Sequence, residues 1–358
     1  MTASDAGRIV LHREDASLTI DPAAGARFAS LVVNGHELLV TEGAGPIRWG
    51  CYPMAPFAGR IRAGRFAFQG RAYGVPVSMP PNAIHGTVLD RSWEVVGRGD
   101  DHVELMTELG PSWPFAGQVI QAVALVPGGL EATLEVRAAE PMPVVLGWHP
   151  WFRREVGGAS VTLDFEARWM YERGPDGLPT GATVPPTPRP WDDAFGDIVI
   201  PPRLTWPGAI RLDLRSTAPF WVVFDEEPHA ICVEPQTAPP DAFNLAAAIG
   251  VEPPTVTPER PATVAMAWRW TTLGPPPAPP RAKRQPRTKT VASKPAASKP
   301  RTATPKPKAA SAPQVPAAPK APAAPKVPEP AKRTTTRSKP APVTPSTPPR
   351  TRRARSRR

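Results

Sequence analysis

The chain has 358 residues, including 53 prolines, and a formal net charge of +11 that is unevenly distributed. Residues 275–358 hold 22 lysines and arginines against one acidic residue, Glu329, a net charge of +21, whereas residues 1–274 hold 21 basic and 31 acidic residues, a net charge of −10. Cys51 and Cys232 are the only cysteines, which excludes a disulfide framework and a multi-cysteine zinc cluster.

Residues 1–274 are long enough for one large domain, which at this size buries roughly 75% of its unfolded surface. Residues 1–5 lack a basic and then apolar signal, and no apolar run approaches the roughly 20 residues that span a bilayer. We therefore expect a cytoplasmic protein with no membrane partner.

Short alternating apolar runs closed by turns dominate this body. In chain order they predict hairpins over residues 28–40 around Asn34-Gly35, 65–75 around Gln69-Gly70, 93–106 through residues 97–100, and 119–136 through residues 127–129. Each pattern has the period of two that a half-buried strand requires.

Further strand-like runs lie at residues 160–165, 209–214, 220–224, 230–233 and 262–273. The best helical stretch, residues 241–249, is short, and prolines mark residues 174–191 as a loop. This pattern predicts an all-β fold, a large antiparallel β-sandwich.

A histidine and a carboxylate stand out as candidate catalytic groups. His149 lies in the run Gly-Trp-His-Pro-Trp-Phe, and Glu234 lies in the run Cys-Val-Glu-Pro-Gln-Thr. Each is followed by proline and ends an apolar, strand-like stretch. Such a pair can give a proton to one oxygen while taking one from another, which suggests proton-shuttling chemistry on a polyol or sugar.

Five spaced motifs carry a resemblance to a known family. They are Cys51-Tyr-Pro-Met-Ala-Pro-Phe-Ala-Gly-Arg-Ile-Arg-Ala-Gly-Arg-Phe, Asn82-Ala-Ile-His-Gly, Gly147-Trp-His-Pro-Trp-Phe, Trp191-Asp-Asp-Ala-Phe, and Val233-Glu-Pro-Gln-Thr with Asp241-Ala-Phe-Asn. In this order the body resembles the aldose 1-epimerase (galactose mutarotase) family. The resemblance implies a large antiparallel β-sandwich of galactose-mutarotase type and an isomerase that interconverts the anomers of an aldose.

The resemblance also implies roles for individual residues. Glu234 matches the general base that takes the proton of the C1 hydroxyl, and His149 matches the acid that protonates the ring oxygen. Substrate-binding roles fall to Arg60, His85, Asp192 and Gln121. The rate should then fall at low pH as Glu234 is protonated and at high pH as His149 loses its proton. The reaction only relocates protons, so neither metal nor cofactor is implied.

Departures from the best-known galactose mutarotases leave the sugar open. Those enzymes carry Asn where this chain has Gly59, and Asn-His-Thr-Tyr-Phe-Asn where it has the His149 motif. One alternative is a hexose-6-phosphate mutarotase, with Arg62, Arg65 and Arg71 as phosphate ligands. Another is a non-catalytic carbohydrate-binding or sensing protein.

Two local choices also stay open in the sequence. Either Asp192 or its neighbour Asp193 could face the substrate. Trp148 and Trp151, which flank His149, could stack on a sugar or pack in the core.

Residues 275–358 read as a separate, basic tail of proline, alanine, lysine, arginine, serine and threonine. Such a composition cannot bury enough apolar surface to offset the entropy of ordering, so disorder is expected. Its charge predicts an arm for nucleic acid or another polyanion, and a solubility extension is the alternative. No aromatic residue follows Trp270, so base stacking is not expected.

Overall fold

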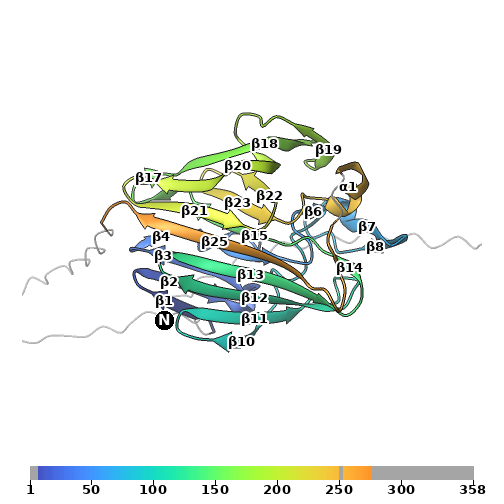
Figure 1. Cartoon of the computed structure of the whole chain (residues 1–358), viewed down its shortest axis with the longest axis horizontal. Helices are drawn as coiled ribbons and strands as arrows, with labels where there is room; N and C mark the ends of the chain where they lie inside the picture. The colour runs from blue at the N-terminus through green and yellow to red at the C-terminus, as the bar shows by residue number, and fades with distance from the viewer. Residues whose placement is uncertain (1–6, 250–252, 276–358) are drawn as a thin grey trace, which may run out of the picture. The chain divides into compact units, whose positions relative to one another are not determined.

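Two series of antiparallel strands make up most of the computed structural model, which describes residues 7–249 and 253–275 (Figure 1). The predicted all-β antiparallel architecture is confirmed. The predicted basic tail lies outside the described residues, apart from Pro275. No helix in the described ranges is long and apolar enough to cross a membrane.

The first series, here called the β13 layer, is held by consecutive antiparallel pairings. Its strands, in spatial order, are β10 (Glu94–Arg98), β11 (His102–Glu108), β12 (Gly117–Val126), β13 (Gly129–Ala138), β25 (Ala262–Thr272), β21 (Ile210–Ser216), β20 (Asp192–Trp206), β18 (Thr162–Arg173) and β19 (Pro179–Val184).

The second series, the β15 layer, is built in the same way. Its strands are β1 (Ile9–Arg13), β2 (Ala16–Asp21), β3 (Arg27–Val33), β5 (Cys51–Met54), β15 (Gly147–Arg153), β23 (Ala230–Gln236) and β22 (Phe220–Phe224), followed by the first residues of β20. The two layers therefore share β20, whose start pairs with β22 and whose end pairs with β21.

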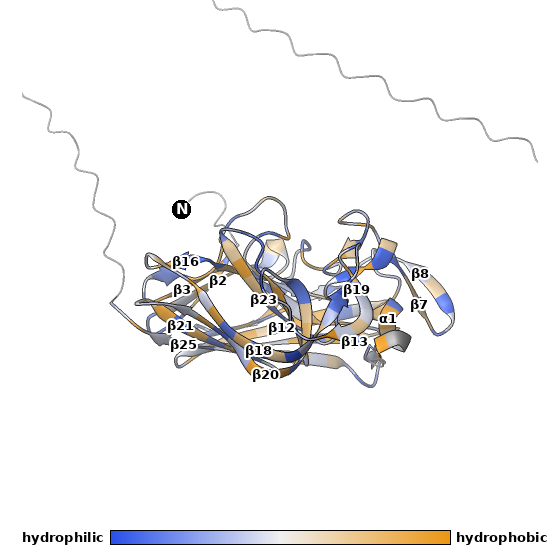
Figure 2. Cartoon of the chain, turned by 90° about the horizontal axis from the view of Figure 1, so that it is seen from above, coloured by the Kyte–Doolittle hydropathy of each residue, from blue (hydrophilic) through white to orange (hydrophobic). Residues whose placement is uncertain are grey.

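Side chains from both layers meet in one core. Phe28 of β3 and Phe152 of β15 both contact Trp268 of β25, with ring centroids 6.2 and 5.1 Å apart. Apolar and polar residues alternate along the strands, as Figure 2 shows in colour and as β2 shows with every second residue buried. Each strand thus gives one face to the core, which is what a sandwich requires.

Short elements gather at one end of the layers, to the right in Figure 1. They include the pairs β6 (Arg60–Ile61) with β9 (Ala83–Ile84), β7 (Arg65–Phe68) with β8 (Arg71–Gly74), and β14 (Met142–Pro143) with β24 (Thr255–Val256), and the helix α1 (Ala242–Ile249). The remaining short elements are β4 (His36–Glu37), β16 (Glu155–Val156), β17 (Ala159–Ser160) and the 3₁₀ turns η1 (Pro22–Ala24) and η2 (Arg62–Gly64).

The predicted hairpins around residues 34–35 and 69–70 are confirmed, and their turn residues have the positive φ that a tight turn requires. Asn34 and Gly35, both with positive φ, connect β3 and β4, and Gln69 and Gly70 connect β7 and β8 in the same way. The helix near residue 241 is confirmed as α1. The prediction of a loop over residues 174–191 was wrong in part, because β19 pairs with the end of β18 there.

Candidate active site

A cleft opens on the face of the β15 layer that points away from the core. Strand register explains which residues reach it: Gly147 pairs with Gln236 and Trp151 with Cys232, which sets His149 opposite Glu234. His149 also pairs with Tyr52 on the other side, and Glu234 pairs with Val222. Residues opposite one another share a face of the sheet, so these side chains form one row across four strands.

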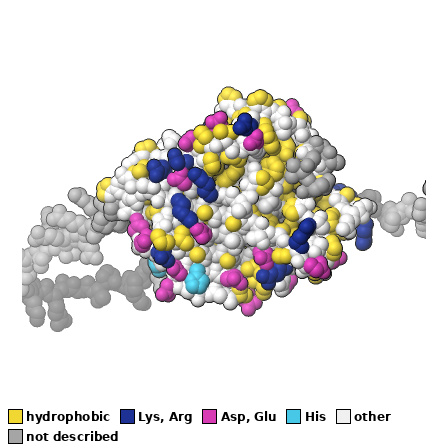
Figure 3. All heavy atoms as spheres, viewed as in Figure 1, with side chains coloured by type: hydrophobic (Ala, Val, Ile, Leu, Met, Phe, Trp, Pro, Cys, Tyr) yellow, Lys and Arg dark blue, Asp and Glu magenta, His cyan; other side chains and the backbone are white. Residues whose placement is uncertain are grey.

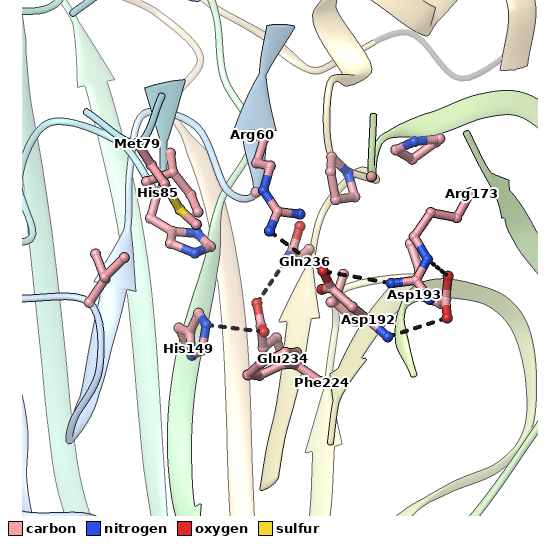
Figure 4. A pocket seen from close by; sticks show the side chains of 18 of the residues that line it. Arg60, Met79, His85, His149, Arg173, Asp192, Asp193, Phe224, Glu234 and Gln236 are labelled. Carbon is pink, nitrogen blue, oxygen red and sulfur yellow. Dashed lines mark hydrogen bonds and ion pairs between the residues drawn. The ribbon is translucent and has the colours of Figure 1, made fainter. Parts of the chain in front are cut away.

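The cleft encloses about 790 Å³ of space, which includes open solvent at its mouth. Its lining comes from both layers and the short elements above them, and includes Arg48, Arg60, Met79, His85, His149, Trp151, Tyr171, Arg173, Asp192, Asp193, Phe224, Glu234 and Gln236. Figure 4 labels ten of these residues, whose side chains converge from segments that are far apart in the chain.

His149 and Glu234 form a direct pair at the base of the cleft (Figure 4). The imidazole Nε2 lies 3.2 Å from the carboxylate Oε1, and both residues are at least 95% buried. This distance allows a proton to pass between the two groups. The predicted pair is therefore brought together, although its members lie on separate strands.

Two aromatic rings pack against the His149 imidazole. Tyr52 stacks with it at 5.0 Å between centroids, and Trp151 stacks with it at 5.3 Å with only 10° between the planes. The imidazole Nδ1 is buried and receives no hydrogen bond from another described residue. The two stacked rings and the contact of Nε2 with Glu234 therefore restrain the orientation of the ring.

Strand alternation settles the roles of the two tryptophans near His149. Trp151 shares its parity with His149 and lines the cleft. Trp148 points to the opposite face, is fully buried in the core, and donates from Nε1 to Gln121 Oε1 at 2.9 Å.

Arg60 on β6 and His85, directly after the paired strand β9, both reach the cleft. Gly59 precedes Arg60 at φ +68, and a Cβ there would lie 2.9 Å from Pro240, so the close approach requires glycine. His85 itself has φ +57, a left-handed conformation that is costly for a residue with a side chain. Its backbone N–H bonds to the Gly59 carbonyl at 2.8 Å. Such strain is typical of residues held in place for function.

Asp241 holds the Arg60 segment in position. Its backbone N–H bonds to the Arg60 carbonyl at 2.7 Å, and its buried carboxylate accepts from the Arg62 backbone N–H at 2.9 Å and from Arg62 Nε at 3.2 Å. The Asp241 motif of the sequence is therefore structural, and it commits Arg62 to an ion pair outside the cleft lining.

The two adjacent aspartates have different partners. Asp192 Oδ2 lies 3.5 Å from Arg60 Nη2, and the residue is partly exposed in the cleft. Asp193 is buried and pairs through Oδ1 with Arg173 Nε at 3.2 Å. Asp192, on the cleft-facing parity of β20, is therefore the carboxylate available beside Arg60.

The prediction that Gln121 contacts the substrate is corrected by its position. Gln121 lies on β12, faces the core between the two layers, and is fully buried outside the cleft lining. Its Nε2 donates to the Ala26 carbonyl at 2.8 Å, and its Oε1 accepts from Trp148. Both ends of the amide are used, so Gln121 ties the layers together.

Several cleft residues received no role from the sequence, among them Tyr52, Arg173 and Gln236, which line or border the site. Tyr52 and Gln236 stand inside motifs, directly after Cys51 and two residues after Glu234, whereas Arg173 does not. A period of two along β23 places Gln236 on the same face as Glu234, and this signal could have identified it.

Burial shifts the proton affinities of the pair in opposite directions. It lowers the pKa of His149 to about 3, with a smaller contribution from Arg60. It also raises the pKa of Glu234 well above its ordinary value of 4.5, and Asp192 adds to this rise while Gln236 and Arg60 oppose it. The pKa of His85 falls well below 6.5 through burial and then through His149. Across a wide pH range the His149–Glu234 pair therefore holds one proton, mainly on Glu234.

No group of three or more histidine, cysteine, aspartate or glutamate side chains within residues 7–249 and 253–275 is arranged to hold a metal ion. Four side chains in the cleft, those of Arg60, His85, Asp192 and Gln236, carry groups that can form hydrogen bonds with a ligand.

Comparison with known proteins identifies similar sequences and similar solved structures. YphB from Escherichia coli K12, an uncharacterized protein, is 29% identical over 216 residues, which cover 53% of this chain and 74% of YphB. A solved structure of a candidate aldose 1-epimerase from Escherichia coli K12 has a TM-score of 0.66 at 22% identity, covering 74% of this chain and 99% of that chain.

Two further solved structures share the fold. A galactose mutarotase-like protein from Clostridium acetobutylicum has a TM-score of 0.67 at 18% identity and covers 74% of this chain and 95% of its own. Galactose 1-epimerase from Lactobacillus acidophilus has a TM-score of 0.61 at 16% identity, and the match covers 74% of this chain and 94% of that chain. The predicted galactose-mutarotase type of sandwich is confirmed.

Residues 8–201 match the family model described as aldose 1-epimerase. The match includes Arg60, His85, His149 and Asp192 and ends before Glu234. Because it covers more than half of the chain, this chain belongs to the aldose 1-epimerase family.

Proposed function

We propose that the protein is a mutarotase that interconverts the α and β anomers of an uncharged aldose by acid–base ring opening and closure. The observation that carries this proposal is the buried His149–Glu234 pair, 3.2 Å apart, in a cleft lined by hydrogen-bonding side chains. Glu234 is the general base and His149 the general acid.

The proton movements balance without another reactant. Glu234 takes the proton of the C1 hydroxyl, the C1–O1 bond becomes a carbonyl, the C1–O5 bond breaks, and O5 takes a proton from His149. After rotation about C1–C2 the reverse steps close the ring on the other face of the carbonyl. The substrate stays uncharged throughout, since one proton leaves as one arrives.

The electrostatics of the site determine where the proton of the pair lies. Ring opening converts an ionised Glu234 and a protonated His149 into a protonated Glu234 and a neutral His149. Burial favours that second arrangement, because it raises the pKa of Glu234 and lowers that of His149. The free pair also rests in that arrangement, so ring opening starts from the minor form in which the proton has moved from Glu234 to His149 across their 3.2 Å contact.

Charge pairing in the cleft supports an uncharged sugar over a sugar phosphate. Arg62 is bound to Asp241 and Asp176, and Arg65 and Arg71 lie on the β7–β8 hairpin and do not line the cleft. The arginines that do line it each face a carboxylate: Arg48 faces Glu227, Arg60 faces Asp192 and Arg173 faces Asp193.

Anomer interconversion measured by polarimetry and exchange NMR tests the proposal. The panel would contain free aldoses and their 6-phosphates, and each rate would be scored as the excess over the spontaneous reaction. We expect an excess for at least one free aldose that disappears in Glu234→Gln. Saturable sugar binding with no excess rate would instead favour a carbohydrate-binding protein, and a clear preference for phosphates would favour the hexose-6-phosphate alternative.

The charge of residues 275–358 supports a second candidate function, salt-sensitive binding of nucleic acid or another polyanion. The tail carries +21, whereas basic and acidic side chains are interspersed on the face of the body in Figure 3. Lysine and arginine bind phosphates without sequence preference and lose affinity as salt rises.

A chain ending at Pro275 provides the matched control for that function, because it keeps every described residue of the body. We expect the full-length chain to be retained on DNA at about 50 mM salt and released by about 200 mM. Equal retention of the two chains at low salt would remove the nucleic-acid proposal.

A further inference from the structure

Gln236 lies two residues beyond Glu234 on β23 and faces the same cleft (Figure 4). Its side chain is fully buried, and its Nε2 donates to Glu234 Oε2 at 3.0 Å. Glu234 Oε1 is already paired with His149, so the two oxygens of the carboxylate have separate partners. The amide and the imidazole together fix the plane of the general base.

The other end of the same amide is unused. No group among the described residues donates a hydrogen bond to Gln236 Oε1, although this oxygen is buried. The orientation follows from chemistry, since an oxygen of Glu234 that faces the amide accepts a hydrogen bond and must meet the NH₂ group. A buried acceptor without a donor costs free energy until a donor arrives.

The identity of that donor follows from the proposed function, on which this inference rests. In a closed aldose ring three oxygens lie on C1 or next to it: O1, the ring oxygen O5, and O2. The O1 proton goes to Glu234, and O5 carries no proton. Only the hydroxyl on C2 has a proton left to donate.

Geometry also places Gln236 Oε1 within reach of that hydroxyl. The C=O and C–N bonds of an amide are about 1.2 and 1.3 Å long, so the two ends of the Gln236 amide lie only roughly 2 Å apart. A substrate whose C1 hydroxyl contacts Glu234 therefore presents its next hydroxyl close to Oε1.

We infer that Gln236 is a specificity-determining residue whose Oε1 accepts a hydrogen bond from the C2 hydroxyl, so that the site selects 2-hydroxy aldoses over 2-deoxy aldoses. Its Nε2 meanwhile orients Glu234. The second role alone would affect all substrates equally, whereas the first depends on the C2 hydroxyl.

The experiment compares D-glucose and D-galactose with their 2-deoxy analogues, using the full-length chain and its variant Gln236→Met. Both kcat/KM for anomer exchange and binding by NMR titration are measured. We expect the wild-type chain to prefer the 2-hydroxy sugar by about 10- to 100-fold. In Gln236→Met both sugars should lose rate, and their ratio should approach one.

Gln121→Met is the matched control, because Gln121 is also fully buried and lies outside the cleft. It should lower stability and leave the ratio unchanged. If Gln236→Met keeps the wild-type preference for the 2-hydroxy sugar over its 2-deoxy analogue, the inference is overturned, but the proposal of mutarotation is not. Selective binding of the 2-hydroxy sugar without any excess rate overturns mutarotation and supports the role of Gln236, whereas binding that ignores the C2 hydroxyl overturns that role.

Discussion

A fully buried glutamine lies in the interior between the two layers, and another lies in the cleft on the outer face of the β15 layer. The two differ in how many hydrogen-bond partners their amides have. In the interior, Gln121 has a partner at both ends of its amide, Ala26 and Trp148. In the cleft, Gln236 binds Glu234 through Nε2 and leaves Oε1 without a donor. Buried polar groups are normally paired, so the unpaired atom marks the place where a ligand completes the network.

Two histidines at the cleft share this feature with Gln236. His85 Nδ1 and His149 Nδ1 are also buried without a hydrogen bond from another described residue, whereas His36 Nε2 is an unpaired buried atom outside the cleft lining. The comparison therefore depends on the two glutamines, of which only the one in the cleft has an unpaired acceptor that costs stability. The predictions below test this difference, from the largest expected effect to the smallest.

Removing either member of the catalytic pair should produce the largest effect. Glu234→Gln and His149→Asn should each lower the excess rate by about 10²- to 10⁴-fold, the usual contribution of a general base or acid. Sugar affinity should change little, because both variants keep a polar side chain in the cleft. Polarimetry gives the rate and NMR titration the affinity. Near wild-type excess rate in either variant would remove that residue from the mechanism.

The pH profile should be a broad bell whose limbs are assigned opposite to the sequence-based expectation. Below the His149 pKa of about 3, His149 gains a second proton while Glu234 remains protonated, so no base is left. Above the raised pKa of Glu234, the pair loses its single proton and no acid is left.

The profile of kcat/KM against pH measures both limbs, which belong to the coupled pair. We expect no loss of activity between pH 6.5 and about 5, where an ordinary histidine would titrate. A limb centred near pH 4.5 that disappears in Glu234→Gln would restore the ordinary assignment of the acid limb to Glu234.

Substituting the two glutamines should separate stability from activity. Gln121→Met leaves Trp148 Nε1 and the Ala26 carbonyl buried without partners, so the free energy of unfolding should fall by about 1–3 kcal/mol. Gln236→Met should cost less stability, because it also removes an unpaired buried acceptor. Denaturant unfolding of both variants measures the difference. An equal or larger loss for Gln236→Met would contradict the contrast between interior and cleft.

The aromatic rings stacked against His149 should have a smaller effect on rate. Trp151→Leu removes one stacked ring, and aromatic contacts of this kind contribute about 0.5–1.5 kcal/mol, so kcat should fall roughly 2- to 13-fold with little change in KM. Trp151→Phe should recover most of the rate. If Trp151→Leu instead raises KM alone, Trp151 contacts the sugar rather than holding the imidazole.

Local chemistry in the sequence determined several parts of this protein. Asn34-Gly35 and Gln69-Gly70 predicted their hairpins because these residues accept the positive φ that a tight turn needs. The residue types at His149 and Glu234 indicated proton transfer, and the motif spacing indicated the family. These signals depend on neighbouring residues or on residue type alone.

Only the tertiary structure decided which residues meet. A period of two shows that Trp148 and Trp151 face opposite sides of their strand, but it does not show which side is the core. That choice, made by the packing of β15 against β25, sends Trp148 to Gln121 and Trp151 to His149. The order β5–β15–β23 likewise brings Tyr52, His149 and Glu234 into one row. Strand order is set by long-range packing between segments distant in the chain, and no local pattern encodes it.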